Sequence, residues 1–359
     1  MNHWGKYKAA ALLFSLAVCC AAIIGCEGTG GSTAPQPVTN SSLQEPATQI
    51  PESQKLIVYT SHKEEVYRPI IQEFEEETGI LVDTHAGGTT EMLHLMAESE
   101  ADANVDVFFG GGVASLEAYR EYLDPYSVSL KDSLDPSLTS TDDRWTPFTE
   151  LPLIFIYNNK LVNEEDAPKS WREFLDDTWK GEISFADPEK SGTSFTILET
   201  LRDVSGLSLE ETIAAFCDAM DGDMSEGSGE VLQLVDSGEK LVGITLEESA
   251  LKEIARGNDI SIVYPEEGTS VVPDGAAIVR NAPHRENAEK FLDFIVGDAV
   301  QNYAVNTLSR RSVRQDLFPA SRYDFAIVPI NIQKASAEET KALELFHDRM
   351  GVAKGEATP

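Results

Sequence analysis

Short apolar runs alternate with amphipathic stretches along most of the chain. The first apolar run, residues 56–59 (LIVY), is rich in β-branched residues and predicts a buried strand. Residues 62–79 follow with apolar positions at helical spacing and a terminal Gly79, so they predict an amphipathic helix. Ser61, with Glu64 three residues later, predicts a capping box at the start of this helix.

The same strand, turn and helix pattern occurs twice more. Residues 80–84 and 106–109 predict strands, and Gly87–Thr90 and Gly110–Gly112 each come before a stretch with helical periodicity. Three successive units of this kind predict a parallel sheet with helices on both faces. Ligands of open α/β sheets bind beyond the carboxyl ends of the strands, so we expect the three turns to meet at a ligand site.

The pattern continues through the second half of the chain without an internal repeat. Further apolar runs predict strands at residues 151–157, 181–186, 241–245, 260–264 and 276–279. Amphipathic stretches predict helices at residues 171–179, 195–204, 247–257, 286–296, 299–308 and 336–350. Strands and helices thus alternate throughout, and the fold class predicted is α/β.

The N-terminal residues predict a targeting segment. Lys6 and Lys8 precede the uncharged apolar run 9–25, which has 17 residues and is shorter than a typical membrane span. The run ends in IIGC and resembles the bacterial lipobox, which implies a signal peptide over residues 1–25 and a lipid on Cys26. An ordinary secretory peptide and an uncleaved anchor are the alternatives.

Residues 26–54 are rich in Gly, Ser, Thr, Pro and Gln, and this composition predicts a disordered tether. Cys217 is the only cysteine in the body and Cys26 would carry the lipid, so no intrachain disulfide is expected after processing. Cys217 lies in a helical pattern and is predicted to be a small buried hydrophobe.

The net charge and the lack of catalytic motifs narrow the classes of function that the sequence predicts. The formal net charge is −33, which argues against nucleic acid and anionic membrane surfaces as partners. The body of about 300 residues is typical of two lobes. It contains no G-x-S-x-G or H-E-x-x-H motif and no Cys–His pair suited to catalysis, so we predict a protein that is not an enzyme and needs no cofactor. Its many carboxylates leave a glycoside-active enzyme as an alternative.

Five segments in order resemble the extracellular solute-binding proteins of bacterial ABC importers, in the branch that binds ferric ion, thiamine, phosphonates and hexose phosphates. The segments are VYTSHKEEVYRPIIQEFEEETGI, DVFFGGGVASLEAY, FADPEKSGTSFTIL, VYPEEGT and NAEKFLDFIVGDAVQ, and the resemblance covers residues 56–318. It implies a two-lobe periplasmic-binding-protein type II fold. Each lobe has a mixed, mainly parallel sheet flanked by helices, and two hinge strands join the lobes. Lobe 1 comprises residues 55–150 plus 272–320, and lobe 2 comprises 151–271 plus 321–359.

The resemblance also implies partners and a location. We expect a monomer, tethered by lipid to the cell membrane in the periplasm or on the outer face of the cytoplasmic membrane. It would bind a small solute and dock on an ABC permease. The alternative partner is a membrane sensor kinase.

One set of candidate ligand residues concerns iron. In ferric-ion binders of this branch, a His in a matching H-K-E context coordinates iron, so the resemblance makes His62 the metal candidate. The family's carboxylate after the third strand is replaced by Gly110–Gly112, and residues 243–248 lack its pair of tyrosines. Ferric ion is therefore the alternative solute, and an exposed helix-start residue is the other interpretation of His62.

The remaining candidates favour a small polar anion, such as a sugar phosphate or an organophosphonate. Backbone N–H groups at helix N-termini bind anions, although each of these turns could also be a simple cap. In hexose-phosphate binders a Glu in a similar E-G-T segment contacts sugar hydroxyls, which implies this role for Glu267; a solvated turn residue is the alternative. Glu247 and Glu248 lie where that subgroup places polar contacts. Arg310, Arg311 and Arg314 are predicted to pair with the acidic surface, and contact with an anion is the alternative. The predicted ligand-binding residues are Ser61, His62, Gly88, Thr89, Gly110, Gly111, Gly112, Ser191, Gly192, Thr193, Glu247 and Glu267.

Overall fold

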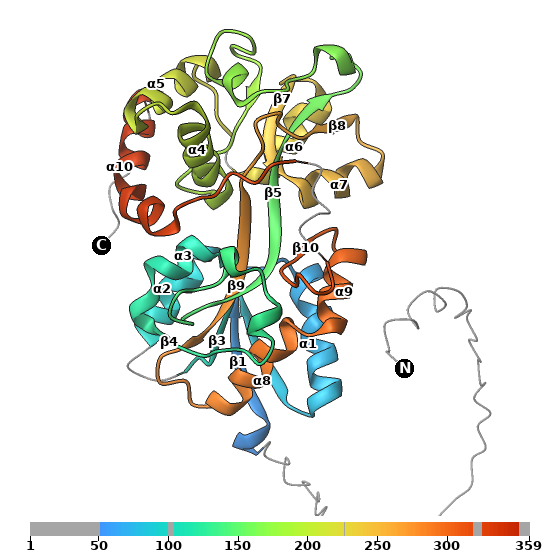
Figure 1. Cartoon of the computed structure of the whole chain (residues 1–359), viewed down its shortest axis with the longest axis vertical. Coiled ribbons are helices and arrows are strands. Elements are labelled where there is room, and N and C mark those ends of the chain that lie inside the picture. The colour runs from blue at the N-terminus through green and yellow to red at the C-terminus, as the bar shows by residue number, and fades with distance from the viewer. Residues whose placement is uncertain (1–50, 100–103, 226, 319–324, 352–359) are drawn as a thin grey trace, which may run out of the picture. The chain divides into compact units, whose positions relative to one another are not determined.

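The computed structural model of the protein describes residues 51–99, 104–225, 227–318 and 325–351 (Figure 1). The predicted signal peptide, Cys26 and most of the predicted tether lie outside these residues. Among the described helices, none is both long enough and apolar enough to cross a membrane.

The first half of the body contains the three predicted strand–helix units. The strands β1, β2 and β3 are parallel, with β1 between the other two. Each is followed by a helix, as the hydrophobic pattern predicts. The elements are β1 (Lys55–Thr60), α1 (Glu64–Thr78), β2 (Leu81–Ala86), α2 (Thr89–Ser99), β3 (Val107–Gly112) and α3 (Val113–Ala118).

Two long strands, β5 (Thr146–Asn158) and β9 (Val271–Val279), connect the two halves of the sheet. They pair with each other antiparallel, while β9 also pairs with β3 and β5 also pairs with β7 and β8. The strand order is β2-β1-β3-β9-β5-β7-β6, so β5 and β9 occupy its centre. Figure 1 shows both strands running between two groups of helices. The shorter strands are β4 (Leu123–Asp124), β6 (Ile183–Ser184), β7 (Val242–Leu246), β8 (Ile260–Val263) and β10 (Arg311–Ser312).

The other helices fall close to the predicted stretches, apart from α6, which was not predicted. They are α4 (Gly192–Ser205), α5 (Leu209–Met220), α6 (Ser228–Ser237), α7 (Glu247–Arg256), α8 (Arg285–Ile295), α9 (Asp298–Asn306) and α10 (Ile332–Met350). The 3-10 turns are η2 (Glu52–Gln54), η3 (Arg120–Tyr122), η4 (Lys131–Ser133), η5 (Pro136–Leu138), η6 (Glu164–Asp166) and η7 (Trp171–Phe174).

Separate apolar cores support the two ends of the sheet. One core includes Phe74, Phe109 and Phe291, which pack edge to face between α1, β3 and α8. Another core lies in the second half of the protein and includes Phe155, whose ring packs edge to face against Trp171. Such large buried rings contribute much of the apolar area that stabilises a fold. Cys217 lies in the second core as predicted, and its burial raises the pKa of the thiol to about 12.

Three predictions about local structure are wrong. Residues 171–179 form only the 3-10 turn η7, because Asp176 accepts a hydrogen bond from the Thr178 N–H (2.8 Å), a local bond that competes with helix continuation. Helix α1 begins at Glu64 with Lys63 as its N-cap, without a side-chain cap, so the capping box of Ser61 does not form. Residues 52–54 belong to a 3-10 turn rather than to the tether.

The third glycine-rich turn also differs from the prediction. Gly110–Gly112 are the last residues of β3 and not a turn between strand and helix. The helix α3 that follows has 6 residues. It is therefore too short to form the extended helix N-terminus on which the predicted anion-binding role depends.

Candidate functional site

The turns after β1 and β2 meet the carboxyl end of β3. The Ser61 N–H donates to the carbonyl of Phe109 (3.3 Å), and the Thr60 hydroxyl donates to the same carbonyl (2.6 Å). The Gly87 N–H donates to the Thr60 carbonyl (3.1 Å). The three segments expected to meet are therefore neighbours, although the third one is the end of strand β3 rather than a turn.

Two of the glycines are required by this close approach. A Cβ atom on Gly110 would lie 2.7 Å from the Ser61 Oγ, and its φ of +127° also disfavours a side chain. A Cβ atom on Gly111 would lie 2.8 Å from the Thr89 methyl carbon. The predicted residues Ser61, Thr89, Gly110 and Gly111 are thus close neighbours, and Gly112 pairs with Asp274 on β9.

His62 is buried beneath this edge, so its interpretation as an exposed helix-start residue is wrong. Its ring packs edge-on against Phe109 (4.5 Å between centroids) and Phe148 (5.6 Å). Its Nε2 lies 3.7 Å from the Oδ2 of Asp274. Burial, and after it the positive charge of Arg310, lowers the pKa of His62 well below 6.5. The imidazole is therefore neutral at pH 7.

Asp274 is the centre of a charged network between the two long strands. It accepts hydrogen bonds from the N–H (2.8 Å) and the hydroxyl (2.5 Å) of Thr149 on β5, and a further one from Nη1 of Arg310. Burial raises the pKa of the Asp274 carboxyl, and the favourable contacts with Arg310 and Thr149 offset this only in part. A buried carboxylate of this kind depends on its arginine partner.

The network extends to the start of helix α7. The Nε of Arg310 lies 3.9 Å from Oε1 of Glu248. Arg311 donates two hydrogen bonds to the carboxylate of Glu247 (2.7 and 2.6 Å), which also accepts one from the Tyr264 hydroxyl. Both glutamates are buried. The predicted candidates Glu247 and Glu248 therefore face the arginines that follow α9.

The prediction that the arginines pair with the protein surface is wrong. Arg310 retains 9% exposure and Arg314 retains 3%. Arg314 lies apart from the network, where it binds Asp316 and the Val296 carbonyl. The residues around these arginines in the sequence are mostly polar and gave no sign of the burial. The burial follows from the pairing of β10 with β5.

Polar atoms of three neighbouring residues are buried without a hydrogen-bond partner within the described protein. They are the Oγ of Ser61, the Nε2 of His62 and the Nε of Arg310. Leaving a polar group unpaired in the interior costs about 1–3 kcal/mol, so such atoms require an explanation. A polar ligand that contacts them would remove this cost.

The other predicted ligand residues do not join this network through any described contact. Ser191 accepts a hydrogen bond from the Ser194 N–H (3.3 Å) and is the N-cap of α4, as its alternative interpretation holds. Gly192 and Thr193 lie in the first turn of α4. The carboxylate of Glu267 accepts hydrogen bonds from the Ser170 hydroxyl and the Trp171 N–H.

Gly88 also has a local partner, because its N–H donates to Glu91 (3.4 Å). Asp274, Thr149 and Tyr264 are members of the site that the sequence interpretation missed. For Asp274 a signal existed, since an aspartate inside the apolar strand VVPDGAAIV is costly to bury without a functional or structural partner.

Comparison with known proteins identifies related chains. Residues 98–321 match the family model described as bacterial extracellular solute-binding protein. Iron uptake protein A1 of Synechocystis sp. is 24% identical over 328 residues, which cover 86% of each chain. A Salmonella typhi protein, provisionally named as a 2-aminoethylphosphonate-binding periplasmic protein, is 21% identical over 72% of this chain and 77% of its own length.

Solved structures share the fold. The periplasmic binding protein AfuA from Actinobacillus pleuropneumoniae, with exogenous fructose-6-phosphate bound, superposes with a TM-score of 0.72. It is 20% identical in sequence, and the match covers 83% of this chain and 99% of AfuA. The predicted two-lobe type II periplasmic-binding-protein fold is therefore confirmed. The prediction of mainly parallel sheets is wrong, because β5 and β9 pair antiparallel with the strands beside them.

Proposed function

Because the chain belongs to the family of bacterial extracellular solute-binding proteins, we propose that it captures a small anionic solute bearing a phosphate or phosphonate group. The solute would lie beside Ser61, His62 and Arg310, between the two lobes. Closure of the lobes about β5 and β9 would then enclose it. The loaded protein would deliver the solute to an ABC permease, without catalysing a reaction.

The buried unpaired atoms are the observation that carries this proposal. The Ser61 hydroxyl and the Arg310 Nε–H are hydrogen-bond donors, and the neutral His62 ring can donate in one of its tautomers. Phosphate-type oxygens are acceptors that pair well with arginine and hydroxyl groups. The carboxylates of Glu247 and Glu248 offer acceptors nearby for hydroxyl or ammonium groups of the same solute.

Ferric ion is the second candidate, and it is supported by His62 and by the name of the Synechocystis relative. Two features favour the anion over the metal. A cation at the Nε2 of His62 would be close to the Arg310 guanidinium, whose charge already lowers the pKa of this ring. In addition, Glu247 is neutralised by Arg311 and Asp274 by Arg310, so free anionic ligands are few.

The setting of the protein is part of the proposal. We infer a lipid on Cys26 and a tether that ends before η2, so that the body stays at the membrane beside its permease. We further infer a first lobe of residues 55–150 plus 272–320 and a second lobe of residues 151–271 plus 321–359. The separate apolar cores and the shared strands β5 and β9 support this division.

The test is a binding screen on the full-length protein in detergent. Fructose 6-phosphate, 2-aminoethylphosphonate, inorganic phosphate, fructose and Fe(III)-citrate are compared by thermal shift and calorimetry. We expect a phosphate- or phosphonate-bearing compound to raise the Tm while fructose does not. Arg310→Gln should weaken that binding about tenfold or more, because hydrogen bonds to charged groups contribute about 1.5–3 kcal/mol.

Arg314→Gln is the matched control, because Arg314 is equally buried but lies outside the network. It should lower stability without changing the affinity. Binding of Fe(III) alone, with charge-transfer colour that His62→Ala abolishes, would establish the iron alternative instead. A protein that responds to none of the compounds would contradict both candidates.

A further inference from the structure

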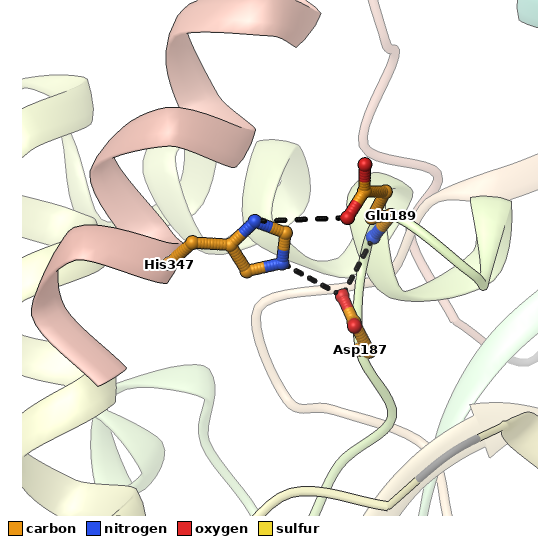
Figure 2. A group of neighbouring side chains, drawn as sticks. All are labelled: Asp187, Glu189 and His347. Carbon is orange, nitrogen blue, oxygen red and sulfur yellow. Dashed lines mark hydrogen bonds and ion pairs between the residues drawn. The ribbon is translucent and has the colours of Figure 1, made fainter. Parts of the chain in front are cut away.

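A second cluster of charged side chains lies away from the arginine network, where helix α10 meets the loop before α4. Figure 2 shows His347 of α10 pointing between Asp187 and Glu189 of that loop. The Nε2 of His347 lies 3.0 Å from Oδ1 of Asp187, and its Nδ1 lies 3.8 Å from Oε2 of Glu189. One ligand atom from each of the three residues falls within 4.8 Å of the other two.

The loop holds the Asp187 carboxylate in place. Its Oδ1 accepts a hydrogen bond from the Glu189 N–H (2.9 Å), and its backbone carbonyl accepts one from the N–H of Ser191 (2.9 Å). The Asp187 N–H donates to the carbonyl of Ser225 (3.0 Å). Asp187 is 5% exposed, whereas the Glu189 side chain reaches solvent. The fixed carboxylate of Asp187 and the histidine on a packed helix are two donors held in place, and Glu189 adds an exposed third donor.

We propose that Asp187, Glu189 and His347 bind a divalent transition-metal cation, with Zn²⁺ as the preferred ion. One imidazole nitrogen and two carboxylate oxygens are ligands that Zn²⁺ accepts at about 2.0–2.2 Å, with water able to complete the tetrahedron. The Nε2 to Oδ1 distance of 3.0 Å is close to the edge of such a tetrahedron. The Glu189 carboxylate lies on the Nδ1 side of the ring, and a rotation of this exposed side chain would be needed to bring it to the Nε2 side.

The nitrogen donor decides the type of ion. Ca²⁺ and Mg²⁺ prefer sites made only of oxygen, whereas imidazole suits Zn²⁺ and its transition-metal neighbours. Affinity at a mixed N and O site rises from Mn²⁺ to Cu²⁺ and is lower again for Zn²⁺, which still binds more tightly than Mn²⁺. The competing arrangement is a His347 ring paired with the two carboxylates without a metal.

A metal here would fix the position of α10. His347 lies 160 residues from Asp187 in the sequence, so the ion would join the C-terminal helix to the start of α4. Helix α10 packs on α5 and also contacts α3 in the first half of the body. The ion would thus stabilise a helix that touches both halves, independently of which solute the protein carries.

Zinc calorimetry on the full-length protein tests this proposal. The protein is made without a histidine tag, kept in detergent and stripped with EDTA before titration with ZnCl₂, MnCl₂ and CaCl₂. We expect one Zn²⁺ per chain at this site, weaker Mn²⁺ binding and no response to Ca²⁺ there. His347→Ala and Glu189→Gln should each weaken Zn²⁺ binding about tenfold or more, the loss typical of an altered metal shell.

His85→Ala is the matched control. His85 also faces a carboxylate, with its Nε2 at 3.5 Å from Oδ2 of Asp83, but it belongs to no group of three ligands among the described residues. This variant should bind Zn²⁺ as the wild type does. Because Glu189 is exposed, Glu189→Gln tests the site even if His347→Ala fails to fold. Wild-type protein that binds no Zn²⁺, or binding that survives both His347→Ala and Glu189→Gln, would overturn the proposal.

Discussion

At the residue scale, buried charges with different partners decide how the protein responds to pH. Burial and then Arg310 lower the pKa of His62, so this ring is neutral in the folded protein. Burial also opposes the charged form of His284, but hydrogen bonds to Glu52 and Asp106 outweigh it and raise the pKa of His284 above 6.5. The free energy of unfolding therefore depends on His62 below pH 6.5 and on His284 above it.

The effect of His284 on stability can be tested above pH 6.5. The contribution of His284 to the free energy of unfolding is fully present below pH 6.5, and it is lost as the pH rises through the raised pKa. Urea unfolding at a series of pH values should show this decline in the wild type and a flatter curve in His284→Gln. His94→Gln, which alters a ring beside the Tyr119 hydroxyl, should keep the wild-type slope. An unchanged slope in His284→Gln would show that the contacts with Glu52 and Asp106 do not hold a charged imidazole.

At the scale of elements, helix α10 is attached to α4 by buried charges. Arg202 on α4 binds Glu199 (2.5 Å), Asp203 (2.9 Å) and Glu338 of α10 (2.7 Å). Glu199 has no exposed surface, and its burial raises its pKa against the opposing effect of Arg202. Without the arginine, that carboxylate would be buried and unpaired.

Arg202→Ala should therefore lower the free energy of unfolding by about 3–5 kcal/mol, the usual cost of leaving one partner of a buried ion pair alone. Chemical denaturation measures this change. In the double variant Arg202→Met with Glu199→Leu no charge is stranded, and most of the stability should return. Arg349→Ala, which breaks an exposed pair between Arg349 of α10 and Asp218 of α5, should have little effect. If Arg202→Ala and Arg349→Ala lower the free energy of unfolding by the same amount, Glu199 does not depend on Arg202.

The order of elements was predictable from the sequence, because each strand or helix carries its own hydrophobic period. The site was predictable only where its residues follow or end a strand, as Ser61, His62 and Glu247 follow one and Gly110 ends one. The charged network depends on register: Asp274 lies 125 residues from Thr149 and 36 from Arg310, and the pairing of β5 with β9 and β10 joins them. Long-range pairing of this kind leaves no local pattern in the sequence, so the arginines were misassigned to the surface.

At the scale of the whole body, ion pairs between side chains of α7 and residues of the other half connect the two lobes that we infer. Lys252 of α7 binds Glu65 of α1 (2.7 Å) and also pairs with Glu248 of its own helix. The hydrogen bond to Lys252 lowers the pKa of Glu65. Arg311 of β10 binds Glu247, again joining α7 to residues that pair with β5. These contacts hold α7 against the first half of the body.

The pair between Lys252 and Glu65 should favour the closed arrangement that holds solute. Lys252→Met removes it, and a partly exposed ion pair contributes about 0.2–1 kcal/mol. The affinity for whichever solute the screen identifies should therefore fall by about 1.4-fold to fivefold, with the loss appearing in the dissociation rate because opening becomes easier. Arg68→Met removes a pair with Glu64 inside α1 and should leave the affinity unchanged. Stopped-flow dissociation distinguishes the two variants, and equal rates in both would mean that the Lys252 pair does not control opening.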